Sequence, residues 1–173
     1  LSKWREYLEK SAYINLFGHD IYSYGKEKMG VSAYLNREGC DTINNFLKSF
    51  AFGQTIEYTH ESKGSKYTII AGKDEEDKLV AFRREGLGEP IPFGEESSGN
   101  QALLRLLPVY LSVISNGGML LVDEFSSGFH NELEELLIKY FMVKSTHSQM
   151  FFVSHSTNIL SNSVLRPDQE YAI

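Results

Sequence analysis

The spacing of apolar side chains changes twice along the chain, and each change predicts a new kind of element. Residues 1–53 show helical spacing near both ends, whereas residues 18–39 have little periodicity and predict a loop. The clearest helical stripe follows Asp41, which can cap a helix, and consists of Ile43, Phe46, Leu47 and Phe50. The pattern therefore predicts a mainly helical, lid-like segment over residues 1–53.

Apolar and polar residues alternate from Gln54 onward, which is the period of half-buried strands. The alternating apolar positions are Ile56, Tyr58, Tyr67, Ile69, Leu79 and Ala81. Turn residues at Lys63-Gly64 and a charged run over residues 73–77 separate these strands. Residues 54–93 are therefore predicted to form an antiparallel β meander.

A third pattern begins after this meander and opens with a helix. Ser97 or Ser98 can cap a helix that runs to about Ser115. Its residues are apolar on nearly every side, so we expect the helix to be buried. Pro108 predicts a kink or a break within it.

Two short apolar runs follow this helix, Met119–Val122 and Met150–Val153. Continuous apolar runs of this length are typical of central parallel strands. Between them Asn131 can cap a helix, with Glu134 three residues on as the partner in a capping box. Strand, helix and strand at this spacing predict right-handed parallel crossovers, and hence an α/β fold.

The end of the chain predicts two further elements, a short helical piece over residues 158–161 and a third strand over residues 170–173. The three patterns together predict three parts with different roles. These are a helical segment over 1–53, a β meander over 54–93 and an α/β lobe over 94–173.

Composition limits the class of protein. The 173 residues suffice for one domain with a real core, and the net charge of −6 does not favour a nucleic-acid partner. The single cysteine, Cys40, allows no internal disulfide and fits a reducing compartment. No apolar run reaches the ~18–20 residues of a membrane span. We therefore expect a soluble, cytoplasmic protein without a membrane partner, and a chain that is part of a larger protein.

The segment Ser97-Ser98-Gly99-Asn100-Gln101 is the first candidate for chemistry. Small residues let a backbone approach a phosphate closely, and the free amides and dipole of a helix N-terminus favour an anion. The same residues are also explained by a serine that only caps the helix, next to a glycine that tolerates many backbone conformations. Taken alone, the segment favours the cap.

Two strand ends carry the second candidate. Asp123-Glu124 closes the first apolar run, and His155 follows the second. An aspartate at that position can hold Mg²⁺ through water, and the adjacent glutamate can polarise a water near a terminal phosphate. A histidine there can hydrogen-bond a phosphate. The alternatives are a solvated acidic pair and a structural histidine.

A different interpretation treats Asp123, Glu124, His130 and His155 as ligands of a divalent metal in a metallohydrolase. No HExxH or HxH spacing and no cysteine pair supports it. For His130 we favour a structural role at the start of the helix that follows it.

In combination, these segments resemble a known family. Residues 94–173 are similar to the C-terminal half of an ABC-type ATPase head, and more narrowly to AAA-family ATPases that include OLD-like and phage-defence members related to SMC heads. The family signature resembles Ser97–Gln101 followed by the "LLP" step at Leu106-Leu107-Pro108. The family's Walker B strand resembles Met119–Glu124. Its D-loop resembles Ser126–Asn131, and its switch histidine resembles His155.

The resemblance implies a P-loop NTPase fold and an ATPase that uses ATP and Mg²⁺. It implies a head-to-tail dimer in which the signature, Ser97 to Gln101, binds ATP in trans. In the same scheme Asp123 holds Mg²⁺ through water, Glu124 acts on the attacking water and His155 senses the γ-phosphate. A nuclease effector and DNA are the partners that the family implies.

The chain departs from the family in one respect, because it contains no GxxxxGK[ST]. Gly18 to Glu27 is the nearest candidate, but Gly18 and Gly25 are too far apart and Glu27 stands where Ser or Thr is required. We therefore expect the Walker A lobe outside this chain, and expect the chain alone to be inactive. A non-catalytic interaction module derived from such a lobe is the second hypothesis, and a transporter ATPase subunit is the third.

Overall fold

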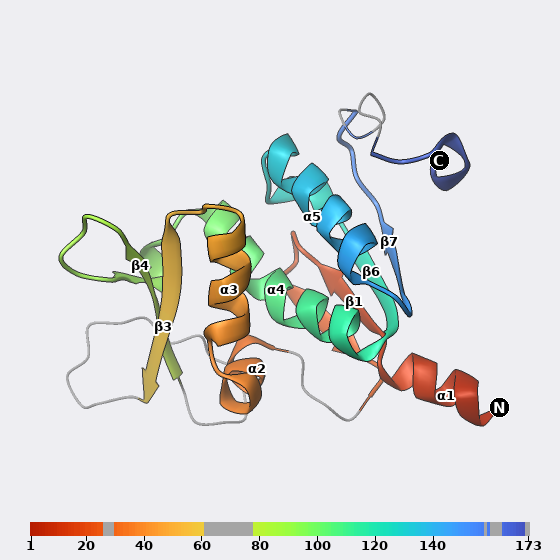
Figure 1. The fold of residues 1–173 in the computed structure, drawn as a ribbon, viewed down its shortest axis with the longest axis horizontal. Coiled ribbons are helices and arrows are strands. Elements are labelled where there is room, and N and C mark those ends of the chain that lie inside the picture. The colour runs from red at the N-terminus through yellow and green to blue at the C-terminus, as the bar shows by residue number, and fades with distance from the viewer. Residues whose placement is uncertain (26–29, 61–77, 158, 160–163, 172–173) are drawn as a thin grey trace. The chain divides into compact units, whose positions relative to one another are not determined.

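The computed structural model describes residues 1–25, 30–60, 78–157, 159 and 164–171 (Figure 1). Its contacts divide the chain into two compact units. Unit 1 comprises Leu1–Glu27 and Val109–Ile173, and unit 2 comprises Lys28–Pro108.

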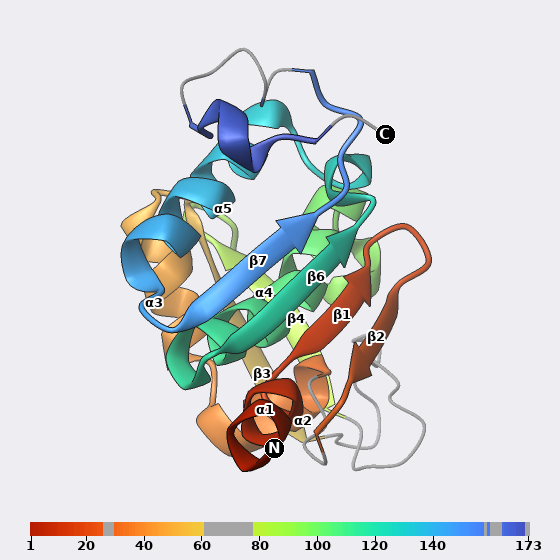
Figure 2. The same cartoon turned by 90° about the vertical axis from the view of Figure 1, so that its right-hand side faces the viewer.

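A four-stranded sheet forms the centre of unit 1. Its order is β2 (Asp20–Ser23), β1 (Ala12–Asn15), β6 (Gly118–Asp123) and β7 (Ser148–Phe152). Figure 2 shows the four strands side by side, with β1, β6 and β7 running in the same direction. The predicted parallel pairing is therefore confirmed. The expectation of a second buried strand is wrong, because β7 is the last strand in this order and its side chains alternate between half-buried and exposed. Because the carboxyl ends of parallel strands meet at one edge, the residues that follow these strands gather there.

The hairpin of β1 and β2 corrects the prediction that residues 1–53 are mainly helical with a loop over 18–39. Three helices are also present there: α1 (Ser2–Glu9), α2 (Val31–Glu38) and α3 (Asp41–Ser49). The predicted cap at Asp41 is wrong, because Cys40 occupies the N-cap position without a side-chain hydrogen bond. The roles assigned to residues 1–53, 54–93 and 94–173 stay predictions.

Helix α4 (Ser98–Asn116) confirms the predicted buried helix. It continues through Pro108, so the expected break does not occur, although the proline has no amide to donate to the Leu104 carbonyl. Within unit 1, the hydroxyl of the buried Tyr110 donates to the Leu137 carbonyl at 2.6 Å. This bond joins α4 to α5 (Asn131–Lys144).

Two predictions near the C-terminus are wrong. His130, not Asn131, is the N-cap residue of α5, and no capping box forms because Glu134 is buried. Glu170 and Tyr171 do not form a strand; they follow the short 3₁₀ helix η3 (Pro167–Gln169). The predicted helical piece over residues 158–161 lies almost entirely outside the described residues.

Unit 2 contains the antiparallel sheet that the meander predicted, with β4 (Lys78–Arg84) between β3 (Gln54–His60) and β5 (Ile91–Pro92). Helix α3 packs alongside β3 (Figure 1). The Asn44 amide fixes this contact, since it donates to the Ile56 carbonyl at 2.9 Å and accepts from the Ile56 amide at 2.7 Å. The predicted turns at residues 63–64 and 73–77, and the strand around Tyr67, lie outside the described residues.

Across the described ranges, no helix has both the length and the apolar character needed to cross a membrane.

Candidate functional site

Asp123 is the last residue of β6, and three neighbours orient its carboxylate. Its Oδ2 accepts hydrogen bonds from the Tyr13 hydroxyl at 3.1 Å and the Asn15 amide at 3.2 Å. Its Oδ1 accepts from the Glu124 backbone amide at 3.1 Å. Asn15 is in register with Asp123 on the neighbouring parallel strand, which brings its amide to the carboxylate. A carboxylate held in this way is preorganised for a ligand.

Glu124 follows in the left-handed backbone conformation, with φ 56° and ψ 42°. This conformation costs a non-glycine residue about 1–3 kcal/mol, and it persists only where the surroundings enforce it. Here Ser127 donates to the Glu124 carbonyl from its amide at 2.9 Å and from its hydroxyl at 2.7 Å. Backbone strain of this kind is concentrated at functional sites, which favours a role for Glu124 beyond a solvated acid.

His155 lies beside Glu124, as the order of the strands predicts. The His155 amide donates to the Ser126 hydroxyl at 3.0 Å, which anchors the segment after β7 to the segment after β6. The His155 Nε2 and Glu124 Oε1 atoms are 3.8 Å apart, and the imidazole side chain is 77% exposed. Asp123, Glu124 and His155 therefore meet at one edge of the sheet, with the last two open to solvent.

The signature segment lies in unit 2, where Ser97 is the cap of α4. Its hydroxyl accepts the Asn100 amide at 3.3 Å, and its carbonyl accepts the Gln101 amide at 3.0 Å. Ser97 and Ser98 are exposed. The backbone amides of Ser98 and Gly99 have no acceptor among the described residues. A helix N-terminus with unpaired amides favours an anion, so capping and phosphate binding are compatible here.

The sequence analysis missed the residues that support these side chains. Tyr13 and Asn15 orient Asp123, and Ser126 anchors His155. The Glu96 carboxylate accepts a hydrogen bond from the Asn100 side chain of the signature. Ser126 belongs to the predicted D-loop, but Tyr13, Asn15 and Glu96 belong to no motif. Only strand register and burial, which depend on residues far away in sequence, identify them.

The metallohydrolase interpretation gains no geometric support. Within the part of the chain that the structure describes, no group of three or more His, Cys, Asp or Glu side chains could hold a metal ion. His130 has the structural position favoured for it: its carbonyl accepts the Leu133 amide at 2.9 Å at the start of α5.

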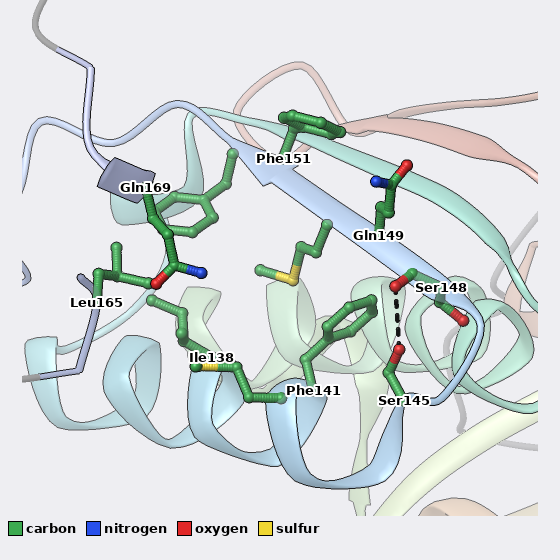
Figure 3. Close-up of a pocket in the computed structure, with 11 residues that line it drawn as sticks. Ile138, Phe141, Ser145, Ser148, Gln149, Phe151, Leu165 and Gln169 are labelled. Carbon is green, nitrogen blue, oxygen red and sulfur yellow. Dashed lines mark hydrogen bonds between the residues drawn. The ribbon is translucent and has the colours of Figure 1, made fainter. Parts of the chain in front are cut away.

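A pocket of about 380 Å³ lies between α5 and β7 in unit 1. Figure 3 shows Ile138 and Phe141 from α5 facing it, with Leu165 and Gln169 at one end. No predicted site residue lines this pocket. It is therefore separate from the edge of the sheet where Asp123, Glu124 and His155 meet.

Glu134 is a fully buried carboxylate in the first turn of α5, and its oxygens make no hydrogen bond with the described residues. Burial raises the pKa of Glu134 above its ordinary value of 4.5, because its carboxylate has lost water and has no hydrogen-bond donor among the described residues. The Ser156 hydroxyl is hydrogen-bonded to Asn131 at 3.3 Å. Glu134 therefore binds its proton more tightly in the folded state than in the unfolded state.

This shift predicts a specific dependence of stability on pH. The contribution of Glu134 is fully present below pH 4.5 and is lost as the pH rises through the raised pKa of the folded state. Glu134→Gln removes this titration, so its free energy of unfolding should fall less than that of the wild type as the pH rises from 4.5 to 7. Denaturant unfolding at several pH values measures the difference. The exposed Glu132→Gln in the same turn is the control. Parallel pH profiles for Glu134→Gln and the wild type would contradict the assignment.

The donor set at the edge of the sheet fits a magnesium nucleotide. Mg²⁺ prefers oxygen ligands and keeps several waters, and Asp123 presents an oriented carboxylate to which a hydrated ion can bind. Glu124 and His155 lie within reach of one another and face solvent.

A parallel sheet that carries an acidic residue at the end of one strand and a histidine after the next is compatible with a P-loop NTPase-like α/β fold. The comparison with protein families agrees. A family described as "AAA domain, putative AbiEii toxin, Type IV TA system" matches residues 52–161, more than half of the chain. The chain belongs to this family. No curated protein matches it.

Proposed function

We propose that this chain is the signature-bearing lobe of an ABC-like ATPase head that dimerises head to tail around ATP. The observation that carries the proposal is the meeting of Asp123, Glu124 and His155 at the carboxyl ends of two adjacent parallel strands. The strained backbone of Glu124 supports it independently.

Each residue at this edge has a separate role in the proposal. Asp123 holds Mg²⁺ through water, using the carboxylate that Tyr13 and Asn15 orient. Glu124 accepts a proton from the attacking water, and His155 hydrogen-bonds the terminal phosphate. Bound Mg-ATP supplies the phosphoryl group and the metal charge that stabilises its transfer.

The signature contributes from the other protomer. Ser97, Ser98, Gly99, Asn100 and Gln101 present a helix N-terminus to the ATP that the partner holds. The unpaired amides of Ser98 and Gly99 provide the phosphate contact, while the hydroxyl of Ser97 caps the helix and borders the same surface. The missing GxxxxGK[ST] motif belongs, in this proposal, to a lobe outside these 173 residues.

The cellular role that we propose is ATP-driven switching in defence against phage or in DNA maintenance, with a nuclease as effector. The resemblance to OLD-like ATPases supports the nuclease and the DNA. The description of the matching family, which names an AbiEii toxin and a type IV toxin–antitoxin system, supports a defence context. A non-catalytic interaction module is the second candidate, and the absence of a P-loop motif from the chain favours it.

The proposal also predicts how the isolated chain behaves. We expect it to bind Mg-ATP weakly and not to hydrolyse it, because the P-loop supplies most of the grip on the β- and γ-phosphates. Calorimetric titration of the 173-residue chain with Mg-ATP measures this. Micromolar binding would mean that the chain holds a complete nucleotide site, which would contradict the proposed split of the site between two lobes.

A test of the function itself uses the full-length protein. We expect Mg-ATP to double its mass in solution and Mg-ADP to leave it unchanged, because the terminal phosphate is the group that the partner's signature contacts. A full-length protein that hydrolyses no ATP and does not dimerise on it would support the interaction module instead.

A further inference from the structure

We propose that a closed ring of four side chains, Glu96, Arg84, Gln54 and Asn100, positions the signature turn for the phosphate of the partner's ATP. This inference rests on the proposed function and extends it to Glu96, Arg84 and Gln54, which lie outside the signature. These three are positioning residues, since they act through Asn100 and the other groups of the signature.

The ring closes through four polar contacts within unit 2. Arg84 pairs with Glu96 Oε1 at 2.5 Å and donates from Nε to Gln54 Oε1 at 3.1 Å. Gln54 Nε2 donates to Asn100 Oδ1 at 3.1 Å. Asn100 Nδ2 donates to Glu96 Oε2 at 2.5 Å, which returns to the starting carboxylate. Each member therefore binds two others.

Burial explains why the ring has to be complete. The Glu96 side chain is 2% exposed, whereas the Arg84 side chain is 37% exposed. A buried carboxylate is costly unless a cation and hydrogen-bond donors surround it. Glu96 has both, because its carboxylate also accepts the Ser97 amide at 3.0 Å and the Ser97 hydroxyl at 3.4 Å. Removal of one member takes one partner from each of its two neighbours, and the loss is most costly at the buried Glu96 and Gln54.

The ring determines which groups the signature presents. The Ser97 amide and the Asn100 side chain are bound to Glu96, and Gln101 Nε2 donates to the Glu96 carbonyl at 2.8 Å. These bonds hold the first turn of α4 in one conformation, with the amides of Ser98 and Gly99 left for a ligand. A binding site that is already ordered pays less entropy when the ligand arrives.

Two members of the ring come from the antiparallel sheet. Gln54 and Arg84 are directly opposite each other in the pairing of β3 with β4. The paired strands thus fix the positions of the two side chains that contact Asn100 and Glu96. In this inference, the function of the β meander is to orient the signature. The hydrogen-bond partners of metal ligands change affinity or activity about 10- to 100-fold when they are removed, and we expect an effect of that size for the ring.

The experiment compares variants of the full-length protein. Arg84→Met removes the charge and keeps the stem, Arg84→Lys keeps the charge without the fork that also reaches Gln54, and Glu96→Gln keeps the shape of the carboxylate. Arg83→Met is the matched control, because Arg83 lies on the same strand and pairs with Glu57 at 3.0 Å on the surface. Light scattering during a titration with Mg-ATP gives the ATP concentration for half-maximal dimerisation, and a melting curve gives stability.

We expect Arg84→Met and Glu96→Gln to need about 10- to 100-fold more ATP for dimerisation, measured well below their melting temperatures. Arg84→Lys should fall between Arg84→Met and the wild type, and Arg83→Met should match the wild type. Arg84→Met and Glu96→Gln proteins that melt earlier but dimerise at the wild-type ATP concentration would overturn the inference and leave the proposed function intact. A wild-type protein that does not dimerise on ATP would overturn both.

Discussion

In the full-length protein, Glu124→Gln is expected to slow ATP hydrolysis by about 10²–10⁴-fold while the protein still binds ATP and dimerises on it. The substitution keeps the size and hydrogen bonding of the side chain but removes the carboxylate that accepts a proton from water. Because hydrolysis ends the ATP-bound state, the dimer should also persist for longer. Steady-state phosphate release and the lifetime of the dimer after ATP is diluted measure the two effects.

A control separates this effect from a general loss of negative charge. Glu132 is exposed in the first turn of α5, so Glu132→Gln removes the same charge from unit 1 without changing the end of β6. It should turn over ATP at the wild-type rate. Turnover close to the wild type in Glu124→Gln would remove Glu124 from the catalytic role, and would favour the interpretation of Asp123-Glu124 as a solvated acidic pair.

The sequence predicted the elements whose signals are local and strong. Helix α4 is rich in apolar residues, and strands β6 and β7 contain the apolar runs Met119–Val122 and Met150–Phe152. The parallel order of β6 and β7 follows from the helix between them. That order alone predicts that Asp123, Glu124 and His155 meet at one edge. The meander also has a local signal, because alternation defines β3 and β4 without knowledge of the rest of the chain.

The missed features all depend on contacts between distant residues. Strand β1 has four residues, too few to show a period, and it forms a strand because Tyr13 pairs in register with Leu121. The same register places Asn15 beside Asp123, where its side-chain amide donates to the carboxylate. The orientation of the Asp123 carboxylate could therefore not be predicted from the sequence either. Glu134 has the spacing of a capping box and lies in the first turn of α5. Its side chain is buried, however, and makes no hydrogen bond to the helix end.

The second large effect is expected at the signature. Ser97→Arg should abolish ATP-driven dimerisation of the full-length protein, and with it hydrolysis, while one protomer binds ATP almost as well as before. A long cation at the exposed N-terminus of α4 blocks the approach of the partner's phosphate to the amides of Ser98 and Gly99. Loss of the cap costs about 0.5–2 kcal/mol of stability in either interpretation, so stability alone does not decide the role.

Two controls separate the cap from the interface. Ser97→Ala loses the hydrogen bond to the Asn100 amide without adding bulk, so it should melt like Ser97→Arg and still dimerise at a higher ATP concentration. Ser49→Arg adds the same cation at the exposed end of α3, within the same unit, and should dimerise like the wild type. If all three variants dimerise equally well, the signature has no role in trans.

The most direct measurement of the central claim is the mass of full-length Ser97→Arg in solution, by light scattering with and without Mg-ATP. Mg-ATP should double the mass of the wild type and of Ser49→Arg, and the mass of Ser97→Arg should stay that of one protomer although it still binds the nucleotide. A folded Ser97→Arg protein whose mass doubles at the wild-type ATP concentration would contradict the account, and would leave Ser97 as the cap of α4 alone.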